Sequence, residues 1–369
     1  MADEADDDRW MALALRLAHS AVGDTAENPP VGCVLVRDGR IVGRGRTGSG
    51  GRPHAEAVAL AQAGNAARGA TAFVTLEPCA HHGRTPPCAD ALVAAGVVRV
   101  VAAIGDPDPR VDGGGFATLR RAGVSVSVGV AAQQAATATT GFLSRVQDAR
   151  PFVTLKIATS LDGRIATASG ASRWITGTAA RRHAHVVRAR QDAILVGIGT
   201  ALADDPALTC RTPGLEERSP VRVVLDSGLR LPVDSDLART ARWVPTWVIT
   251  SVGAGSGHAR ALTDLGVEVF GVARDAGGRP DVPAVLATLA GRGIGRVLVE
   301  GGATVARSFV AADAVDEIQW YRAPILIGGD GRPAVDALDV ATPDGAPRFD
   351  RTDCISLDAD MLETYRRRP

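Results

Sequence analysis

The sequence predicts an α/β fold in two domains. Short runs of β-branched residues alternate with helical patterns along most of the chain, which is typical of a sheet with crossover helices on its faces. At 369 residues the chain is too long for one ordinary core and suits about two domains. The pattern stops at DARP (148–151) and then restarts. We therefore place one domain at residues 1–149 and a second at 150–369.

The first domain opens with helical spacing over 9–21, where the acidic residues Asp6 to Asp8 favour the helix N-terminus. The tripeptide RDG between two apolar runs signals a hairpin of strands 31–36 and 40–45. Glycine or proline marks the ends of several later helices. The remaining elements expected here are helices at 54–64, 86–96, 115–122 and 131–147, and strands at 71–78, 99–106 and 125–130.

The second domain restarts the alternation with the apolar run PFVTLKIATS at 151–160. A strand at 296–302 runs through a glycine turn into a helix over 303–316, and a long late strand is expected at 317–329. The other elements expected are a helix at 178–191 and strands at 192–199, 221–227, 246–250 and 267–272.

Composition excludes several classes of protein. Acidic and basic residues balance at 41 each and aromatic residues make up 4%, which argues against a nucleic-acid partner. No run of about 18 apolar residues occurs, so we expect no membrane span. The acidic start MADEADDDRW resembles neither a signal nor a transit peptide. The five cysteines are few and scattered, which favours a reducing cytoplasm over a disulfide framework.

Metal-binding residues are concentrated around LEPCAHHGRTPPC (76–88) and the earlier HAE at 54–56. His54, Cys79 and Cys88 together supply three protein ligands, the number that a catalytic zinc takes while it keeps a position for water. Zinc lowers the pKa of bound water, and Glu56 is placed to carry a proton to a leaving nitrogen. This pattern is the signature of zinc deaminases, except that the cysteines are nine positions apart.

A structural zinc site is the alternative, with His81 or His82 as a fourth ligand. Such a site has no use for a glutamate beside His54, so we favour the catalytic interpretation.

The segments NPPVGCVLV, HAEAVAL, TLEPCAHHGRTPPC and KIATSLDGRIA resemble the bifunctional riboflavin-biosynthesis deaminase/reductases over nearly the whole chain. The resemblance implies a cytidine-deaminase-like αβα domain followed by a dihydrofolate-reductase-like α/β domain. It implies hydrolytic deamination of 2,5-diamino-6-ribosylamino-4(3H)-pyrimidinone 5′-phosphate. NADPH-dependent reduction of the ribosyl group to ribityl would follow. Carried over by motif, His54, Cys79 and Cys88 bind Zn²⁺ and Glu56 shuttles the proton.

The same resemblance implies substrate contacts in the deaminase. Asn28 would hold the pyrimidine, His81 would contact the substrate and Arg84 would face its phosphate, which suits the fork of a guanidinium. An ordinary turn before two prolines is the alternative for Asn28. Cys33 lies in an apolar strand pattern and is expected in the core.

The second domain has no complete Rossmann glycine motif, since VGIGTALADDP (196–206) lacks the third glycine. The turn VEGGAT (299–304) opens a helix and suits a cofactor phosphate, although a plain strand-to-helix turn would look alike. The resemblance implies that NADPH is held by the positions of Ala158, Trp174, Thr200, Asp204, Ser227, Gly302, Ala303 and Thr304. By the same resemblance, the reductase substrate would meet the positions of Ser172, Arg188, Leu208, Arg211 and Glu300, and we add Lys156 because it ends the first strand of this domain beside them.

Lys156 is the only lysine among 41 basic residues, so we expect it to do something that a guanidinium cannot. Its ammonium could bind the substrate or stabilise charge as hydride arrives. Glu300 could donate a proton or orient the ribose, and His183 and His185 are expected on an exposed helix face.

The sequence therefore predicts a cytoplasmic enzyme that binds no nucleic acid or membrane. The resemblance implies that it acts on a phosphorylated pyrimidine and assembles as a homo-oligomer. One rival is a deaminase for guanine or a tRNA base fused to an unrelated reductase. Another is a non-catalytic regulatory protein whose deaminase half is a zinc-stabilised relic; the intact Glu56 argues against it.

Overall fold

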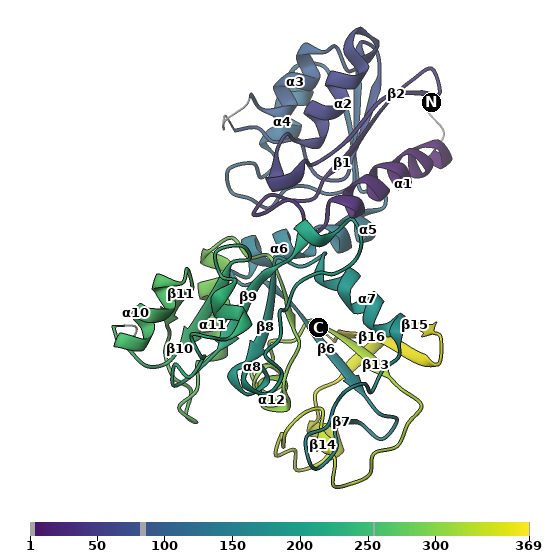
Figure 1. The fold of residues 1–369 in the computed structure, drawn as a ribbon. Coiled ribbons are helices and arrows are strands. Elements are labelled where there is room, and N and C mark those ends of the chain that lie inside the picture. Colours follow the sequence, from purple (N-terminus) through teal and green to yellow (C-terminus); the bar gives the residue numbers. More distant parts are fainter. Residues whose placement is uncertain (1–3, 82–85, 254, 369) are drawn as a thin grey trace. The chain divides into compact units, whose positions relative to one another are not determined.

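The protein is described by a computed structural model that covers residues 4–81, 86–253 and 255–368. The chain forms two compact units, Met1–Arg150 and Pro151–Pro369 (Figure 1). None of the helices in these ranges is long and apolar enough to cross a membrane. The expected α/β class is confirmed in both units.

The first unit is built on a five-stranded sheet in the order β2-β1-β3-β4-β5. The strands are β1 (Gly32–Arg37), β2 (Arg40–Arg46), β3 (Thr71–Val74), β4 (Arg99–Ala102) and β5 (Ser125–Val128). The expected hairpin joins β1 and β2, and its turn residues Asp38 and Gly39 have φ of 51° and 69°. Strands β3, β4 and β5 run parallel, which fits crossover helices between them.

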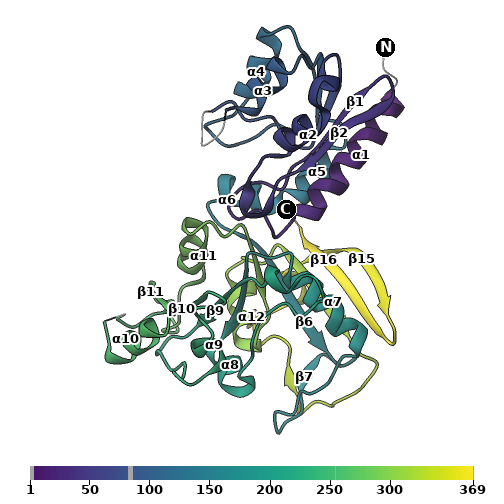
Figure 2. The ribbon, with the colours of Figure 1, turned by 45° about the horizontal axis from the view of Figure 1, so that its top comes forward.

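Helices cover both faces of this sheet. They are α1 (Glu4–Ala21), α2 (Ala55–Ala63), α3 (Cys88–Ala94), α4 (Gly114–Arg121), α5 (Ala132–Ala138) and α6 (Thr140–Gln147). One core joins α2, α3 and α4 to the sheet, and a second joins α1 and α5 to the opposite face (Figures 1 and 2). The single helix expected over 131–147 is two helices that meet at Thr139.

The second unit has a nine-stranded sheet in the order β11-β10-β9-β8-β12-β6-β13-β16-β15. Its strands are β6 (Phe152–Thr159), β8 (Ala193–Gly197), β9 (Val221–Leu225), β10 (Thr246–Thr250), β11 (Glu268–Gly271), β12 (Arg296–Val299), β13 (Glu317–Arg322), β15 (Phe349–Leu357) and β16 (Asp360–Arg367). A separate two-stranded sheet pairs β7 (Arg164–Ala166) with β14 (Arg332–Pro333).

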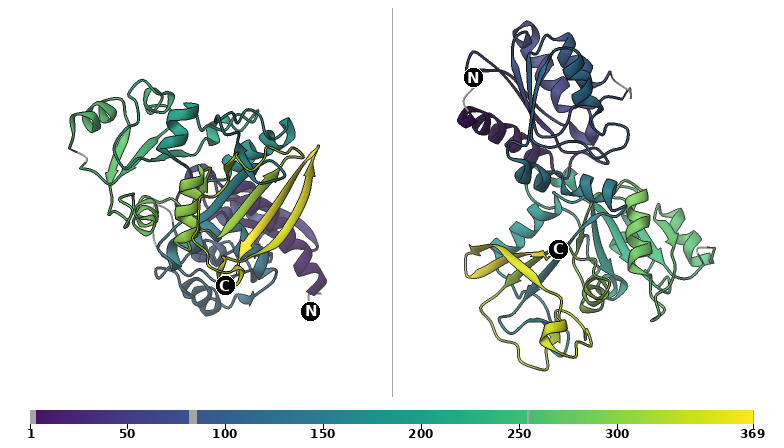
Figure 3. Two further views of the ribbon diagram at one scale, coloured as in Figure 1. Left: turned by 90° about the horizontal axis from the view of Figure 1, so that it is seen from below. Right: turned by 180° about the vertical axis from the view of Figure 1, so that it is seen from behind.

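The strands from β11 to β13 are parallel, and β16 and β15 continue the sheet antiparallel (Figure 3). The strand expected at 317–329 ends at Arg322 because Pro324 cannot donate to the sheet. The hairpin β15–β16 was not predicted from the sequence.

Two cores fill the faces of the large sheet. Helices α11 (Val282–Gly291) and α12 (Ala303–Ala311) pack on one face. On the other face lie α7 (Thr178–Arg188), α8 (Ile198–Asp204), α9 (Asp236–Arg239) and α10 (Gly257–Asp264).

Arg222 on β9 is buried in this second core. Its guanidinium donates to the carbonyl oxygens of Ala207, Leu237 and Val244 and to the Thr240 hydroxyl, at 2.7 to 3.3 Å. It thereby ties the segment 205–211 to the sheet.

Candidate functional site

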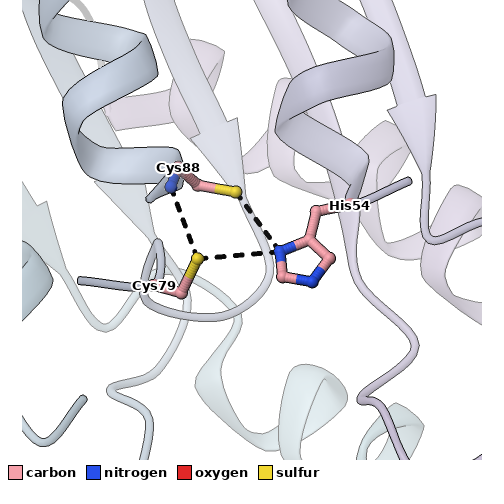
Figure 4. Close-up of side chains that lie close together, drawn as sticks. All are labelled: His54, Cys79 and Cys88. Carbon is pink, nitrogen blue, oxygen red and sulfur yellow. Dashed lines mark hydrogen bonds between the residues drawn. The ribbon is translucent and has the colours of Figure 1, made fainter. Parts of the chain in front are cut away.

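Three elements of the first unit bring His54, Cys79 and Cys88 together. His54 is the N-cap residue of α2, Cys79 follows strand β3, and Cys88 is the first residue of α3. Each side chain therefore stands at the end of an element that the core fixes in place. Figure 4 shows the imidazole and the two thiols facing one another.

The spacing of these atoms fits a zinc ion. Nδ1 of His54 lies 3.6 Å from Sγ of Cys79 and 3.4 Å from Sγ of Cys88, and all three ligand atoms lie within 4.8 Å of one another (Figure 4). A tetrahedral zinc with bonds of about 2.0 Å to nitrogen and 2.3 Å to sulfur sets the N···S edge at about 3.5 Å. The Cys88 thiol and His54 lower the pKa of the Cys79 thiol to about 4, whereas the hydrogen bond to Cys79 and burial raise the pKa of the Cys88 thiol.

Glu56 lies in the first turn of α2, two residues after His54, and is 4% exposed. Burial raises the pKa of its carboxyl to about 7. A carboxyl with such a pKa can both accept and donate a proton near neutral pH. A closed structural site would have no use for such a group.

The residues expected to meet the deaminase substrate have different surroundings. Asn28 lies in a turn before β1, where its backbone N–H donates to the Thr25 carbonyl oxygen at 3.0 Å. Nδ1 of His81 is buried and has no hydrogen-bond partner within the described ranges, so it is available to a ligand. Arg84, like His82, lies outside the described residues.

Glu77 was missed by the sequence reasoning. It is 3% exposed, and its carboxylate accepts hydrogen bonds from the backbone N–H groups of Asp106, Gly113 and Phe116 at 3.1 to 3.3 Å. These bonds tie the start of α4 to the Pro78–Cys79 turn. The sequence signal that could have identified Glu77 is its position as an acidic residue directly after an apolar strand pattern. Cys33 is fully buried in the core, as expected.

In the second unit, the residues expected to hold the cofactor gather at the carboxyl ends of parallel strands. Ala158 is near the end of β6, Thr200 follows β8, Ser227 follows β9, and the turn from Glu300 to Thr304 follows β12. These four strands are neighbours in the sheet order β9-β8-β12-β6. Ligands of open parallel sheets bind at this edge.

The glycine turn after β12 is tied to α8. The Gly302 N–H donates to Oγ1 of Thr200 at 3.1 Å, and Gly302 is the N-cap residue of α12. Inside that helix, the Thr304 hydroxyl donates to Asp336 at 2.6 Å. A helix N-terminus beside a turn without side chains suits the phosphates of a dinucleotide. The residues present therefore fit NADPH.

Lys156, Glu300 and Arg188 form a charged cluster in the second unit. Arg188 donates two hydrogen bonds of 2.8 Å to the Glu300 carboxylate. Burial raises the pKa of Glu300, but Arg188 and Lys156 outweigh burial and lower it to about 2. Burial lowers the pKa of Lys156, and Glu300 opposes that shift. The guanidinium of Arg188, one of the residues expected to meet the reductase substrate, is thus already engaged by Glu300.

The expectation that His183 and His185 face solvent is wrong. Nδ1 of His183 lies 2.8 Å from the Tyr321 hydroxyl, and the Lys156 ammonium lies 5.7 Å from the centre of the Tyr321 ring. His185 contacts Arg211, whose Nη2 lies 3.2 Å from the imidazole Nε2. Helix α7 packs on Tyr321 of β13 and Leu362 of β16, and His185 meets the loop that carries Arg211; local spacing could not reveal either neighbour.

The remaining expected residues of this unit lie around the same edge of the sheet or in the loops beside it. Leu208 is buried with φ of 51°, whereas Trp174 is 67% exposed and lies 4.6 Å from the Arg181 guanidinium. The Asp204 carbonyl oxygen accepts from Arg173 at 3.3 Å. Ala303 begins α12, and Ser172 is half-buried in the loop before α7.

Comparison with known proteins agrees with this geometry. Residues 4–104 match the model of the cytidine and deoxycytidylate deaminase zinc-binding region, and residues 151–362 match the RibD C-terminal domain. The riboflavin biosynthesis protein RibD of Escherichia coli is 42% identical over 355 residues, which cover 93% of this chain and 94% of that protein. RibD of Bacillus amyloliquefaciens is 45% identical over 88% of this chain and 86% of its own.

Solved structures agree as well. Acinetobacter baumannii RibD superimposes with a TM-score of 0.90 at 39% identity over 100% of both chains. A diaminohydroxyphosphoribosylaminopyrimidine deaminase/5-amino-6-(5-phosphoribosylamino)uracil reductase of Thermotoga maritima gives 0.87 at 34% identity over 99% of both chains. The chain belongs to the RibD family of bifunctional riboflavin-biosynthesis enzymes, in which a zinc-dependent deaminase is joined to an NADPH-dependent reductase.

Proposed function

We propose that residues 1–149 carry the deaminase, with zinc held by His54, Cys79 and Cys88, and that residues 150–369 carry the reductase. The observation that carries the proposal is the triangle of His54, Cys79 and Cys88 with the buried Glu56 beside it. Zinc bound there supplies a Lewis acid that activates water. The deaminase substrate is 2,5-diamino-6-ribosylamino-4(3H)-pyrimidinone 5′-phosphate.

Glu56 carries the proton in this reaction. A bond forms between the water oxygen and C2 of the pyrimidine, and the bond from C2 to its amino nitrogen breaks. Glu56 accepts the proton of the water and delivers it to the leaving nitrogen, which departs as ammonia. Asn28, His81 and Arg84 bind the pyrimidine and its phosphate. The buried and unpartnered Nδ1 of His81 supports such a contact.

In the reductase, NADPH binds at the carboxyl ends of β6, β8, β9 and β12. It contacts Ala158, Trp174, Thr200, Asp204, Ser227, Gly302, Ala303 and Thr304. The substrate meets Lys156, Ser172, Arg188, Leu208, Arg211 and Glu300. C1′ of the ring-opened imine gains a hydride and the imine nitrogen gains a proton. Lys156 stabilises charge next to the substrate, and Glu300 fixes the position of Lys156 and Arg188.

We further propose that the enzyme is a cytoplasmic homo-oligomer without a nucleic-acid partner. A net charge of zero and few aromatic residues support the absence of such a partner.

Purified protein should be supplied with the diaminopyrimidinone phosphate, and ammonia release and NADPH consumption followed separately. We expect a zinc chelator to stop ammonia release and to leave reduction of supplied deaminated substrate unchanged. Loss of both activities together would contradict the assignment of two separate sites.

A further inference from the structure

A buried glycine of the first unit lies directly against Asn28. Gly51 ends a short 3-10 turn, η1 (Ser49–Gly51), three residues before the zinc ligand His54. A methyl group on its Cα would overlap the Asn28 side-chain amide nitrogen and would lie 2.7 Å from Asn28 Cγ and from the Thr25 carbonyl oxygen. The Asn28 amide therefore rests on the bare Cα of Gly51.

The segments that carry Gly51 and Asn28 are held together on both sides of this contact. The Thr47 hydroxyl donates to the Pro29 carbonyl oxygen at 2.9 Å, and the Gly50 N–H donates to the Asp24 carbonyl oxygen at 2.8 Å. The Thr25 hydroxyl donates to the Asn28 carbonyl oxygen at 2.7 Å. Neither segment can move away without loss of these bonds, so a larger residue at 51 must displace the Asn28 amide, which is its nearest neighbour, and press on the Thr25 carbonyl group.

The Asn28 amide is also free to meet a ligand. Its backbone is bonded within the turn, whereas its side-chain amide has no hydrogen bond to the described part of the chain. Such an amide offers two donors and an acceptor to a pyrimidine edge.

We propose that Gly51 is a positioning residue of the deaminase, which sets the place of the Asn28 amide against the pyrimidine; this inference rests on the function proposed above. The absence of a side chain at Gly51 leaves the space that the Asn28 amide occupies. Gly51 acts through Asn28 and needs no contact with the substrate itself.

Gly50 provides a matched control. Gly50 and Gly51 have φ of 68° and 87°, so alanine is strained at either position. Only Gly51 has neighbours, because nothing lies within 4 Å of a methyl group at Gly50. The difference between Gly51→Ala and Gly50→Ala therefore reports the contact with Asn28 and Thr25.

The experiment uses the zinc-loaded full-length protein and compares wild type, Gly51→Ala, Gly50→Ala, Asn28→Ala and the double variant Gly51→Ala/Asn28→Ala. Ammonia release is measured against substrate concentration, together with bound zinc and NADPH consumption on deaminated substrate. We expect Gly51→Ala to raise the KM of deamination about tenfold or more, as for a lost hydrogen bond, with zinc and reduction retained. Gly50→Ala should change KM less than about twofold by the same reasoning.

The double variant tests whether Gly51 acts through Asn28. Its KM should equal that of Asn28→Ala, because a displaced amide and a missing amide are equivalent. The inference would be overturned if the increases in KM of the two single variants multiplied in the double variant. It would also be overturned if Gly51→Ala lost its zinc, or if Gly51→Ala and Gly50→Ala raised KM equally. A wild-type protein that releases no ammonia would instead refute the proposed function itself.

Discussion

The Arg188 guanidinium and the Glu300 carboxylate form two parallel hydrogen bonds of 2.8 Å, with only 14% and 9% of their side chains exposed. Each charge has lost most of its water and depends on the other for compensation. Lys156 adds a second positive charge near the same carboxylate. The pair therefore links the stability of the second unit to the charge arrangement proposed for the reductase.

Replacement of Arg188 by alanine leaves a buried carboxylate without its partner. We expect the free energy of unfolding of the second unit to fall by about 3–5 kcal/mol. A urea titration followed by tryptophan fluorescence measures it, since four of the five tryptophans lie after residue 150. Arg348→Ala is the control, because its partner Asp344 is 98% exposed. Equal effects of the two substitutions would show that the buried pair is not stabilising.

The pKa of Glu300 predicts how stability depends on pH. Its value is lowered from 4.5 to about 2 in the folded protein, so the carboxylate stabilises the fold above pH 4.5. That contribution, about 3 kcal/mol, is lost as pH falls from 4.5 towards 2. Urea titrations of wild type and Glu300→Gln at pH 6, 5, 4 and 3 give the free energy of unfolding of each protein. The difference between the two free energies should be constant above pH 5 and should narrow below it. If the stability difference between wild type and Glu300→Gln instead widened as the pH fell, the predicted direction of the pH dependence would be wrong.

Glu56→Gln keeps the shape of the side chain and removes its ability to carry a proton. Ammonia release should fall by about 10²- to 10⁴-fold while zinc content and reduction of deaminated substrate stay unchanged. Asp90→Asn is a close control, because Asp90 also follows a zinc ligand by two residues in the first turn of a helix but is exposed. Undiminished ammonia release by Glu56→Gln would rule out the proton-shuttle role.

Lys156→Met removes the only ammonium of a lysine side chain in the protein and keeps most of its apolar stem. We expect kcat of reduction to fall by about 10²- to 10³-fold, since the compact charge beside the substrate is lost. Ammonia release by the same preparation serves as the internal control and should not change. A variant that reduces the substrate at the wild-type rate would show that Lys156 has no part in the chemistry.

Local patterns in the sequence predicted the elements that carry His54, Cys79 and Cys88, and the structure brings these three residues together. The sequence was sufficient to identify this metal-binding motif, because histidine and cysteine are rare in the chain and two of the three residues stand at the start of a helix. The contacts of His183 with Tyr321 and of Glu77 with Gly113 were missed, since each joins segments far apart in the chain. Periodicity indicates which residues lie on a helix face, but it does not indicate which strand lies beneath that face.

Strand β13 shows a second reason why sequence patterns do not predict the whole structure. Its apolar pattern continues beyond Arg322, but backbone chemistry at Pro324 ends the sheet pairing earlier. Hydropathy alone overestimated its length for that reason. The C-terminal hairpin was missed because most of β15 is exposed and shows no buried face.

Two arginines of different character are among the residues that hold the segment 205–211. Arg222 holds Ala207 through neutral oxygen acceptors only, and Arg188 holds Thr209 while it is also paired with Glu300. The guanidinium that binds Thr209 is thus shared with the Glu300 carboxylate, whereas the guanidinium that binds Ala207 is not. The segment that bears Leu208 and Arg211 is therefore hydrogen-bonded at Thr209 to an arginine that is ion-paired with Glu300, and at Ala207 to an arginine whose hydrogen-bond acceptors are all neutral.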